Sequence, residues 1–585
     1  TSQTMPLADI QQSFGPSASP AVPAITTKTP YYDASWSRLD ATHWELRLKH
    51  HSPHQPAILI RSVGPAGGPV TELHRDGNEV TVNRRWVIRV TPAPSDIALG
   101  DENGPEGLTT RSSGSTWKGA SGWGYARLTL ATDAGEPERE FRLVLEDQRV
   151  PMEMQHYRKN ASQMIHVDLP DPQFQRSMDA QRSHLMMGLI SGETRPGDPA
   201  VFFRAWQRPG AYITSALTRA GDPNVGWVLS RFLATHDFAG GAGPEADAPG
   251  LAIWALTESA AYIADHRHDQ WLWPHILRKT RLIEDMLHAR APVMAPFVVP
   301  SPYDLLHGQQ PRMALLAKPA REGVIVGRIG NHWPSLYVNA VSYRGLLAGA
   351  KFAERLGKHR QAATWKDQAR ILLETWQRRN VNGHAHLDES PMQQAAFSVS
   401  SSPRNLLAQP MTTYSPSPNN LTIAGELIRA HRLLRQGRPE EVWRTLHHVW
   451  ENQASPGLYT WATARTATDD VADGWQYARG WHDRTTVSPD YETAALLLLL
   501  QQDMLAYLDT EAANSPVVIG AGIPPNWISQ SFSVSTLLLP GGSIAWKWDG
   551  HVMHVTLKGP NRKIELGPAF PPGTTLTITH EPLPG

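Results

Sequence analysis

Two kinds of hydrophobic pattern divide the chain into a β-rich part and a helical part. Between residues 42 and 150, short runs such as HWELRLKH and GYARLTLAT alternate apolar and polar residues, with Gly, Pro and Asp between them. This alternation is typical of strands with one buried face, so we predict a β-sandwich over residues 42–150. The preceding residues 1–41, whose first part is rich in Pro, Ser, Thr and Ala, are predicted to form an N-terminal arm.

Apolar residues recur with helical spacing from about residue 172 onward. The pattern predicts ten helices, beginning near residues 172, 209, 223, 248, 269, 335, 359, 419, 439 and 489. Their similar lengths and pairwise order indicate helical hairpins that close into a ring of inner and outer helices over residues 172–510. Residues 511–585 return to alternating runs and predict a small C-terminal β-sheet that caps the ring. The expected fold class is therefore multidomain α+β.

The segment before the last predicted helix combines aromatic and acidic side chains. Residues 473–492 read DGWQYARGWHDRTTVSPDYE and include Trp475, Trp481, Asp490 and Glu492, and the apolar run TAALLLLLQQDMLAYL follows directly. Aromatic rings stack on sugar rings, and carboxylates bind hydroxyl groups or transfer protons. The alternative is structural, because acidic residues also stabilise the first turn of a helix. Taken together, the cluster favours a sugar-binding cleft.

Composition narrows the range of possible functions. The 585 residues include 55 basic and 55 acidic side chains and no cysteine. The balanced charge argues against nucleic acid or an anionic membrane as a partner, and the sequence predicts no membrane span. The lack of cysteine excludes disulfides and thiolate chemistry and fits an exported protein, so we expect a periplasmic or secreted location after removal of a signal peptide. Metal-binding and nucleotide-binding spacings are absent, so we expect no metal and no cofactor.

Four segments carry a family resemblance. They read FFRAWQRPGAYI (202–213), PEADAPGLAIWAL (244–256), GNHWPSLYVNAVSYRGL (330–346) and, from residue 488, SPDYETAALLLLLQQDML. In this order they resemble segments of bacterial glycoside hydrolases with an (α/α)6 barrel, the glucoamylase-like group. The resemblance implies that the ring is an (α/α)6 toroid and that the chain hydrolyses an oligo- or polysaccharide. Pro209 stands where these enzymes have an acidic residue, so the identity of the sugar stays open.

The resemblance also implies the catalytic carboxylates. Inverting glycosidases use a general acid and a general base whose carboxyl groups lie roughly 6.5–9.5 Å apart. Glu492 occupies the base-bearing position of the last inner helix, and Glu322 lies in the loop where related enzymes keep their acid. Asp490 is an alternative for the base, and Asp304 and Glu245 are alternatives for the acid.

Further residues of these four segments and of the segment 473–492 are candidates for substrate binding because they can stack on a sugar ring or bind its hydroxyl groups. They are Trp206, Arg208, Asp247, His332, Trp333, Tyr337, Trp475, Trp481 and Asp490. For Asp247 the resemblance implies a hydrogen bond to a sugar hydroxyl, although Asp at the start of a helix is also a frequent N-cap.

Two other functions are compatible with the sequence. A polysaccharide lyase would remove a proton with a tyrosine or histidine, and Tyr337 and His332 are available, while Arg344 or Asn331 would neutralise the uronate carboxylate. A non-catalytic glycan-binding protein would use the aromatic cleft alone. The leading interpretation is a glycosidase, because it uses the carboxylates as well as the aromatic residues.

Overall fold

The structure is a computed structural model. It describes residues 9–16, 23–39, 42–52, 54–62, 69–102, 108–111, 114–131, 139–149, 165–190, 192–198, 202, 204–221, 223–240, 243–298, 312–321, 323–329, 333, 335–379, 422–464, 486–509 and 514–582. The chain divides into two compact units. The first comprises residues 1–159, 197–203 and 452–490, and the second comprises residues 160–196, 204–451 and 491–585.

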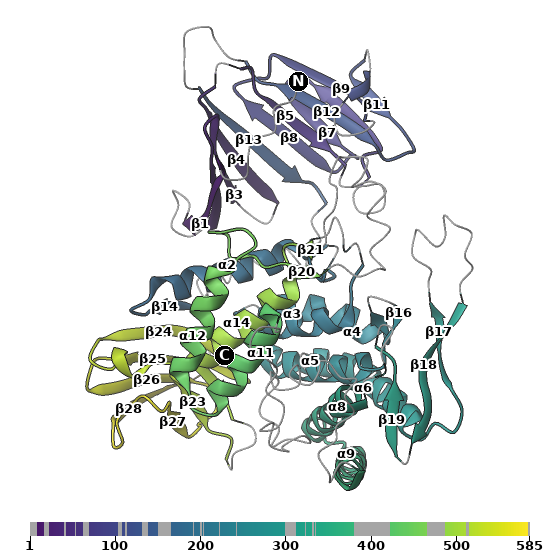
Figure 1. The fold of residues 1–585 in the computed structure, drawn as a ribbon, viewed down its shortest axis with the longest axis vertical. Helices are drawn as coiled ribbons and strands as arrows, with labels where there is room; N and C mark the ends of the chain where they lie inside the picture. The colour runs from purple at the N-terminus through teal and green to yellow at the C-terminus, as the bar shows by residue number, and fades with distance from the viewer. Residues whose placement is uncertain are drawn as a thin grey trace. The chain divides into compact units, whose positions relative to one another are not determined.

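Two antiparallel sheets form the main part of the first unit (Figure 1), which also contains the two-stranded sheet of β20 (Thr463–Ala464) and β21 (Thr486–Val487). The larger has the strand order β1 (Gln11–Pro16), β2 (Pro23–Lys28), β3 (Tyr32–Arg38), β4 (His43–His50), β13 (Arg139–Asp147), β8 (Trp86–Thr91), β7 (Glu79–Val82), β6 (Glu72–Asp76) and β11 (Thr116–Lys118). The smaller has the order β10 (Leu108–Arg111), β9 (Asp96–Glu102), β12 (Gly124–Thr129) and β5 (Ala57–Arg61). Val80 and Val90 of the larger sheet and Leu99 and Leu128 of the smaller belong to one buried core. The two sheets are therefore held together by aliphatic side chains from alternate positions.

Residues 11–16 and 23–38 differ from the arm that we expected. They form β1, β2 and β3, which extend the large sheet by antiparallel pairing from β4 outward. Phe14, Ile25, Trp36 and Leu46 stand opposite one another in a single row across these strands. Backbone hydrogen bonds to neighbouring strands hold these segments in the sheet, although their polar composition gives only a weak strand pattern.

Ten helices lie among the described residues, and all of them belong to the second unit. They are α2 (Pro172–Met187), α3 (Gln207–Arg219), α4 (Pro223–Thr235), α5 (Ala248–Ile263), α6 (His266–Leu287), α8 (Ser335–Arg355), α9 (His359–Arg379), α11 (Ile423–Arg435), α12 (Pro439–Glu451) and α14 (Tyr491–Leu505). Each overlaps one of the ten predicted helices. The mixed α+β character of the chain is confirmed, whereas the closure of the helices into one toroid stays a prediction.

The helices pack as consecutive hairpins and also through a second set of contacts. Within hairpins, α3 packs on α4, α5 on α6, α8 on α9 and α11 on α12. Between hairpins, α14 packs on α2, α3 and α11, α3 packs on α5, and α5 packs on α8. From Thr493 to Leu505, α14 is buried on every side, and the amides of Gln501 and Gln502 donate to the carbonyls of Phe174 and Ala216. A helix that is apolar all round is a central one, as the run of leucines predicts.

Short sheets complete the second unit. One has the order β14 (His166–Asp168), β24 (Phe532–Leu539), β25 (Gly542–Trp548), β26 (Val552–Lys558) and β28 (Thr575–Glu581), and another joins β22 (Ala506–Leu508), β23 (Val517–Ile519) and β27 (Ile564–Leu566). Within residues 291–334, which we expected to be a long loop, β17 (Val293–Val298), β18 (Arg312–Arg321) and β19 (Val324–Gly327) form a third sheet. None of the helices in the described ranges is long and apolar enough to cross a membrane.

Candidate active site

The first turn of α3 places Arg208 and Tyr212 on one face of the helix. The two residues are four positions apart, a spacing that brings side chains of a helix together. Pro209 lies between them and is buried in the first turn, where a missing backbone N–H costs no helical hydrogen bond. Proline at this position is therefore compatible with the helix, and it leaves Arg208 as the charged side chain of this turn.

Arg208 binds two carboxylates from the segment that enters α5. Its Nε donates to Oδ2 of Asp247 at 2.8 Å, and its Nη2 donates to Oε2 of Glu245 at 2.8 Å. Burial by itself lowers the pKa of Arg208, but the negative charges of Asp247 and Glu245 outweigh that effect and hold it well above the usual value. The three side chains form a charge-assisted network that fixes the start of α3 against the start of α5.

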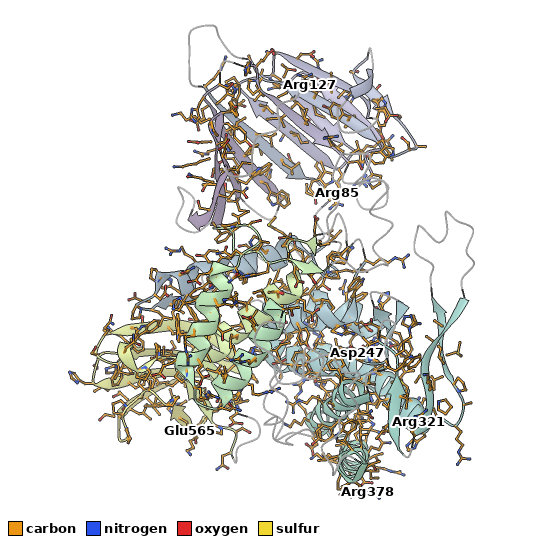
Figure 2. The ribbon with its side chains drawn as sticks, viewed as in Figure 1. Arg85, Arg127, Asp247, Arg321, Arg378 and Glu565 are labelled. Carbon is orange, nitrogen blue, oxygen red and sulfur yellow. The ribbon has the colours of Figure 1, made fainter. Side chains whose placement is uncertain are left out.

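Asp247 precedes α5 but does not cap it through its side chain. Its backbone is helical, with φ −78° and ψ −21°, and its side chain makes no capping hydrogen bond. The residue is 1% exposed, and its Oδ1 has no hydrogen-bond partner within the described part of the chain. The structural alternative for Asp247, a side-chain N-cap, is therefore wrong. A buried carboxylate oxygen without a donor is costly, so this atom is a ready acceptor for a ligand hydroxyl. Asp247 lies among the helices of the second unit (Figure 2).

Tyr212 of α3 and Tyr337 of α8 lie beside this network. Both are 1% exposed, and they are close enough for each to affect the pKa of the other. The guanidinium carbon of Arg208 lies 5.8 Å from the centre of the Tyr337 ring. Burial raises the pKa of the Tyr212 hydroxyl, and the charge of Glu492 raises it further. Burial, then the proximity of Tyr212 and Asp247, raise the pKa of Tyr337, and Glu492 adds to this effect.

Glu492 therefore belongs to the same cluster. It lies in the first turn of α14, and its charge acts on both tyrosines. The structure thus brings together four of the predicted site residues, namely Arg208 of α3, Asp247 directly before α5, Tyr337 of α8 and Glu492 of α14. Their separation in the sequence spans almost three hundred positions, from 208 to 492.

Two glycines allow α5 and α8 to approach closely enough for this arrangement. A Cβ added to Gly250 would lie 2.6 Å from the carbonyl oxygen of Val341, and one added to Gly345 would lie 2.8 Å from the Cα of Gly250. These distances are shorter than side-chain contacts allow, so the two backbones touch at this crossing. The close crossing brings Asp247, at the start of α5, toward Tyr337 in the first turn of α8.

The remaining predicted residues have different positions. Trp206 directly precedes α3 and is half-buried, and Trp333 is half-buried with its ring 4.3 Å from the Nζ of Lys318. Asp490 belongs to the first unit, where its backbone N–H donates to the carbonyl of Trp461 at 2.9 Å. Four residues of the predicted site lie outside the described residues, namely Glu322, His332, Trp475 and Trp481, and so do the alternatives Asp304 and Asn331.

Two members of the cluster were not predicted as substrate-binding residues. Tyr212 had a signal in the sequence, because it follows Arg208 by one helical turn in the same segment. Glu245, which we considered only as an alternative acid, instead binds Arg208. Within the described ranges, no group of three or more His, Asp or Glu side chains is placed to bind a metal ion.

The sequence matches no known protein family and no curated protein. The fold is similar to that of several solved glycoside hydrolases. A bacterial glucoamylase in complex with acarbose is 9% identical, with a TM-score of 0.49 over 85% of this chain and 86% of that one. A GH78 rhamnosidase of Bacillus sp. GL1 is 12% identical, with a TM-score of 0.48 over 92% of this chain and 54% of that one, so the chain spans about half the length of that enzyme.

A GH92 α-mannosidase from Bacteroides thetaiotaomicron is also similar. It is 8% identical, with a TM-score of 0.45 over 92% of this chain and 74% of that one. These solved structures are (α/α)6-barrel glycoside hydrolases, the class that the four sequence segments resemble, and they do not single out one family. With identities of 8–12% and TM-scores below 0.5, these similarities carry no argument about the activity of this chain, and the chemistry has to be argued from the site.

Proposed function

We propose that the protein is a glycoside hydrolase that cleaves an oligo- or polysaccharide, with Glu492 as the general base. The observation that carries this proposal is the cluster of Glu492, Arg208, Asp247 and Tyr337 around the first turns of helices α3, α8 and α14 and the start of α5. A sugar requires hydrogen-bond donors and acceptors at fixed positions, together with a carboxylate near the bond to be broken. The cluster contains all of these groups.

In the proposed reaction, Glu492 takes a proton from a water molecule as the water oxygen attacks the anomeric carbon. The glycosidic bond breaks, and a second carboxylic acid protonates the departing oxygen. We propose Glu322 for this acid, as the family resemblance implies. With the acid and base on opposite faces of the sugar, the anomeric configuration inverts. Arg208 and Asp247 would bind hydroxyl groups, because Arg208 donates hydrogen bonds and Oδ1 of Asp247 accepts one.

The environment of Tyr337 favours a hydrolase over a lyase. A lyase that used Tyr337 as its base would need a hydroxyl that ionises easily. Burial and the nearby negative charges instead raise the pKa of Tyr337 well above its usual value. Tyr337 is therefore suited to donate a hydrogen bond rather than to remove a proton.

The decisive variant is Glu492→Gln, which keeps the size of the side chain but cannot accept a proton. We expect hydrolysis to fall by about 10²–10⁴-fold, the contribution of general acid–base catalysis, while the melting temperature stays nearly unchanged. Activity would be assayed on a panel of oligosaccharides by reducing-sugar release, with proton NMR to identify the first anomer formed. Ultraviolet absorbance would detect the unsaturated product of a lyase.

Glu440→Gln is the matched control. Glu440 is an exposed residue in the first turn of α12, so the change removes a similar charge from a similar helix position outside the cluster. We expect wild-type activity for this variant. Full activity of Glu492→Gln on the substrate of the wild-type protein would refute the assignment of the base.

The proposal includes an extracytoplasmic location, either periplasmic or secreted. The lack of cysteine in 585 residues supports it, since free thiols are a liability in an oxidising compartment. Fractionation of cells that express the native gene would test it, and recovery of the protein with cytoplasmic markers would contradict it.

A further inference from the structure

We propose that Lys279 and Asp237 are positioning residues that anchor the segment carrying Glu245 and Asp247 and thereby set the geometry of the Arg208 network. The consequence for activity rests on the proposed glycosidase function, whereas the anchoring itself does not. Lys279 is far from the ends of α6 and makes no hydrogen bond to Glu245, Asp247 or Arg208 among those found in the structure, so it would act only through the chain between them.

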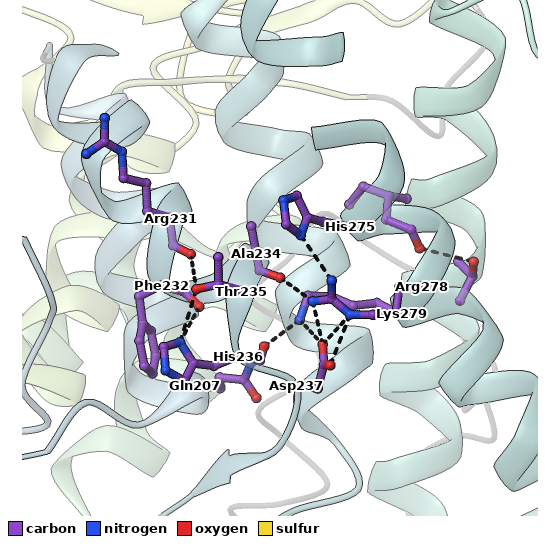
Figure 3. Close-up of polar contacts among 12 residues, drawn as sticks. Gln207, Arg231, Phe232, Ala234, Thr235, His236, Asp237, His275, Arg278 and Lys279 are labelled. Atoms are coloured by element: carbon purple, nitrogen blue, oxygen red, sulfur yellow. Dashed lines mark hydrogen bonds and ion pairs between the residues drawn. The ribbon is translucent and has the colours of Figure 1, made fainter. Parts of the chain in front are cut away.

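Lys279 is 0% exposed, which is rare for a lysine. Its Nζ donates to the carbonyl oxygen of His236 at 2.5 Å and to Oδ1 of Asp237 at 2.8 Å (Figure 3). A buried ammonium group must be compensated by such partners. The two bonds attach the turn at residues 236–237 to the middle of α6.

Two further side chains attach the same turn. Arg278 donates from Nη2 to the carbonyl of Ala234 at 2.6 Å and to Oδ1 of Asp237 at 3.0 Å. From the start of α3, the side-chain amide of Gln207 donates to the carbonyl of His236, as Figure 3 also shows. The carbonyl of His236 therefore accepts hydrogen bonds from both α6 and α3, so the turn fixes these two helices relative to each other.

A short path leads from this turn to the cluster. The chain continues into the hairpin β15 (Ala239–Gly240) and β16 (Gly243–Pro244), and the backbone N–H of Glu245 donates to the carbonyl of Phe238 at 3.1 Å. A Cβ added to Gly240 would lie 2.4 Å from Cδ of Glu245, so the hairpin packs directly against that side chain. Gln207 immediately precedes Arg208 in α3. The turn thus holds both sides of the Arg208 network, Arg208 through Gln207 and the two carboxylates through the hairpin.

The effect of pH on Lys279 distinguishes the anchoring of this segment from the stability of the whole protein. Burial lowers the pKa of Lys279 to about 8, although Asp237 opposes the shift, and Arg278 and His275 are the other charged or titratable side chains in this network. Above pH 8 the folded protein loses the charge on Lys279 while the unfolded chain keeps it up to its ordinary pKa of about 10.5. In that window this group makes folding more favourable as pH rises. The hydrogen bonds of the neutral amine are nevertheless weaker, so the anchor loosens.

The test compares Lys279→Met with the wild type in two measurements. Hydrogen exchange followed by mass spectrometry reports on the amides of residues 243–247, and kinetics on the oligosaccharide that the wild type hydrolyses report on the site. We expect faster exchange at residues 243–247 and a fall in kcat/KM of roughly 10- to 100-fold, mainly through KM, because small misplacements of binding groups have effects of this size. We also expect the activity of the wild type to decline above a pH of about 8 without a matching fall in melting temperature. The Lys279→Met variant should not show this decline.

Asp237→Asn is the second variant. It weakens the same anchor, and the protein should still fold because asparagine has the same size as aspartate and the side chain at this position is partly exposed. Arg355→Met is the control. It breaks the ion pair between Arg355 and Asp269 (2.6 Å) near the start of α6, ten positions or about 15 Å before Lys279. We expect this control to keep wild-type exchange at residues 243–247 and wild-type KM.

Unchanged exchange at residues 243–247 in both Lys279→Met and Asp237→Asn would overturn the proposal. So would an equal rise in KM for Arg355→Met, since the effect would then come from a general loss of stability. If the wild type hydrolyses none of the glycans tested, the proposed function fails, but the exchange measurement still decides whether Lys279 anchors the segment.

Discussion

At the scale of single residues, the unsatisfied oxygen of Asp247 is the most informative atom of the site. Oδ2 of Asp247 is bound to Arg208, whereas Oδ1 is buried and has no partner within the described residues. A protein that used Asp247 only to hold Arg208 would have no reason to leave the second oxygen without a donor. We infer that this oxygen accepts a hydrogen bond from the substrate.

Asp247→Asn tests this inference, because the amide oxygen can still accept from Arg208 while the amino group can no longer accept from a substrate hydroxyl. A hydrogen bond to a charged group contributes about 1.5–3 kcal/mol, which corresponds to a roughly 10- to 150-fold loss in kcat/KM. We expect the loss mainly in KM. Asp367→Asn, at an exposed position of α9, is the control and should behave as the wild type. An unchanged KM for Asp247→Asn would show that Oδ1 does not bind substrate.

At the scale of elements, the crossing of α5 and α8 sets the position of Asp247 relative to Tyr337. The sequence predicted both helices, because their apolar residues recur with helical spacing. It did not predict the crossing, since a glycine in a helix reads as a weak point until the facing backbone is known. For the same reason Arg208, Asp247, Tyr337 and Glu492 were each identifiable from a motif, while their meeting depended on contacts between distant segments.

Gly345→Ala tests the crossing. The new methyl group would lie 2.8 Å from the Cα of Gly250, and overpacking of this kind costs about 1–3 kcal/mol, more than the gain of up to about 1 kcal/mol from replacing a helical glycine. Gly349→Ala, one turn later in α8, is the matched control, because its Cβ would meet Trp365 at an ordinary 3.4 Å. Denaturant unfolding should show a loss of stability for the first variant and a small gain for the second. Equal effects of the two substitutions would mean that the crossing of α5 and α8 can accommodate the added methyl group.

Strands were harder to predict than helices. β1, β2 and β3 contain many Ser, Thr and Gln residues, and their pairing with the rest of the large sheet is a non-local interaction that no short window records. The sheet formed by β17, β18 and β19 was missed because its strands lie within a region expected to be a loop. The four predicted residues that the structure brings together, Arg208, Asp247, Tyr337 and Glu492, do not depend on these strands, and their roles stay a prediction.

At the scale of the whole molecule, the second unit depends on a buried ionic cluster at the other end of α14. Asp503 is 1% exposed and pairs with Arg219 of α3, with Arg435 of α11 at 3.0 Å and with His431 of α11 at 3.3 Å. Burial alone raises the pKa of Asp503, but the two arginines lower it far below the usual range. The cluster links three helices that are distant in the sequence.

Asp503→Asn should therefore destabilise the second unit strongly. Removing one partner of a buried ion pair costs about 3–5 kcal/mol, because the arginines keep their charge without compensation. Since the folded-state pKa of Asp503 is lowered, its contribution is complete above the unfolded value of about 4 and is lost as pH falls below it. The difference in denaturation midpoint between wild type and variant should be large at pH 6 and smaller at pH 3. A constant difference would mean that Asp503 does not carry the effect.

The division of the chain into units has a practical consequence for anyone who wishes to take the protein apart. The first unit is assembled from three separate stretches, residues 1–159, 197–203 and 452–490. The N–H of Phe14, for example, donates to the carbonyl of Gly457 at 2.8 Å. A gene truncated after residue 159 would thus encode the first unit without its residues 197–203 and 452–490. A gene that starts at residue 160 would encode these two stretches without residues 1–159, which belong to the same unit. The two units are not exchangeable modules, so recombination or domain shuffling at their apparent border would break both.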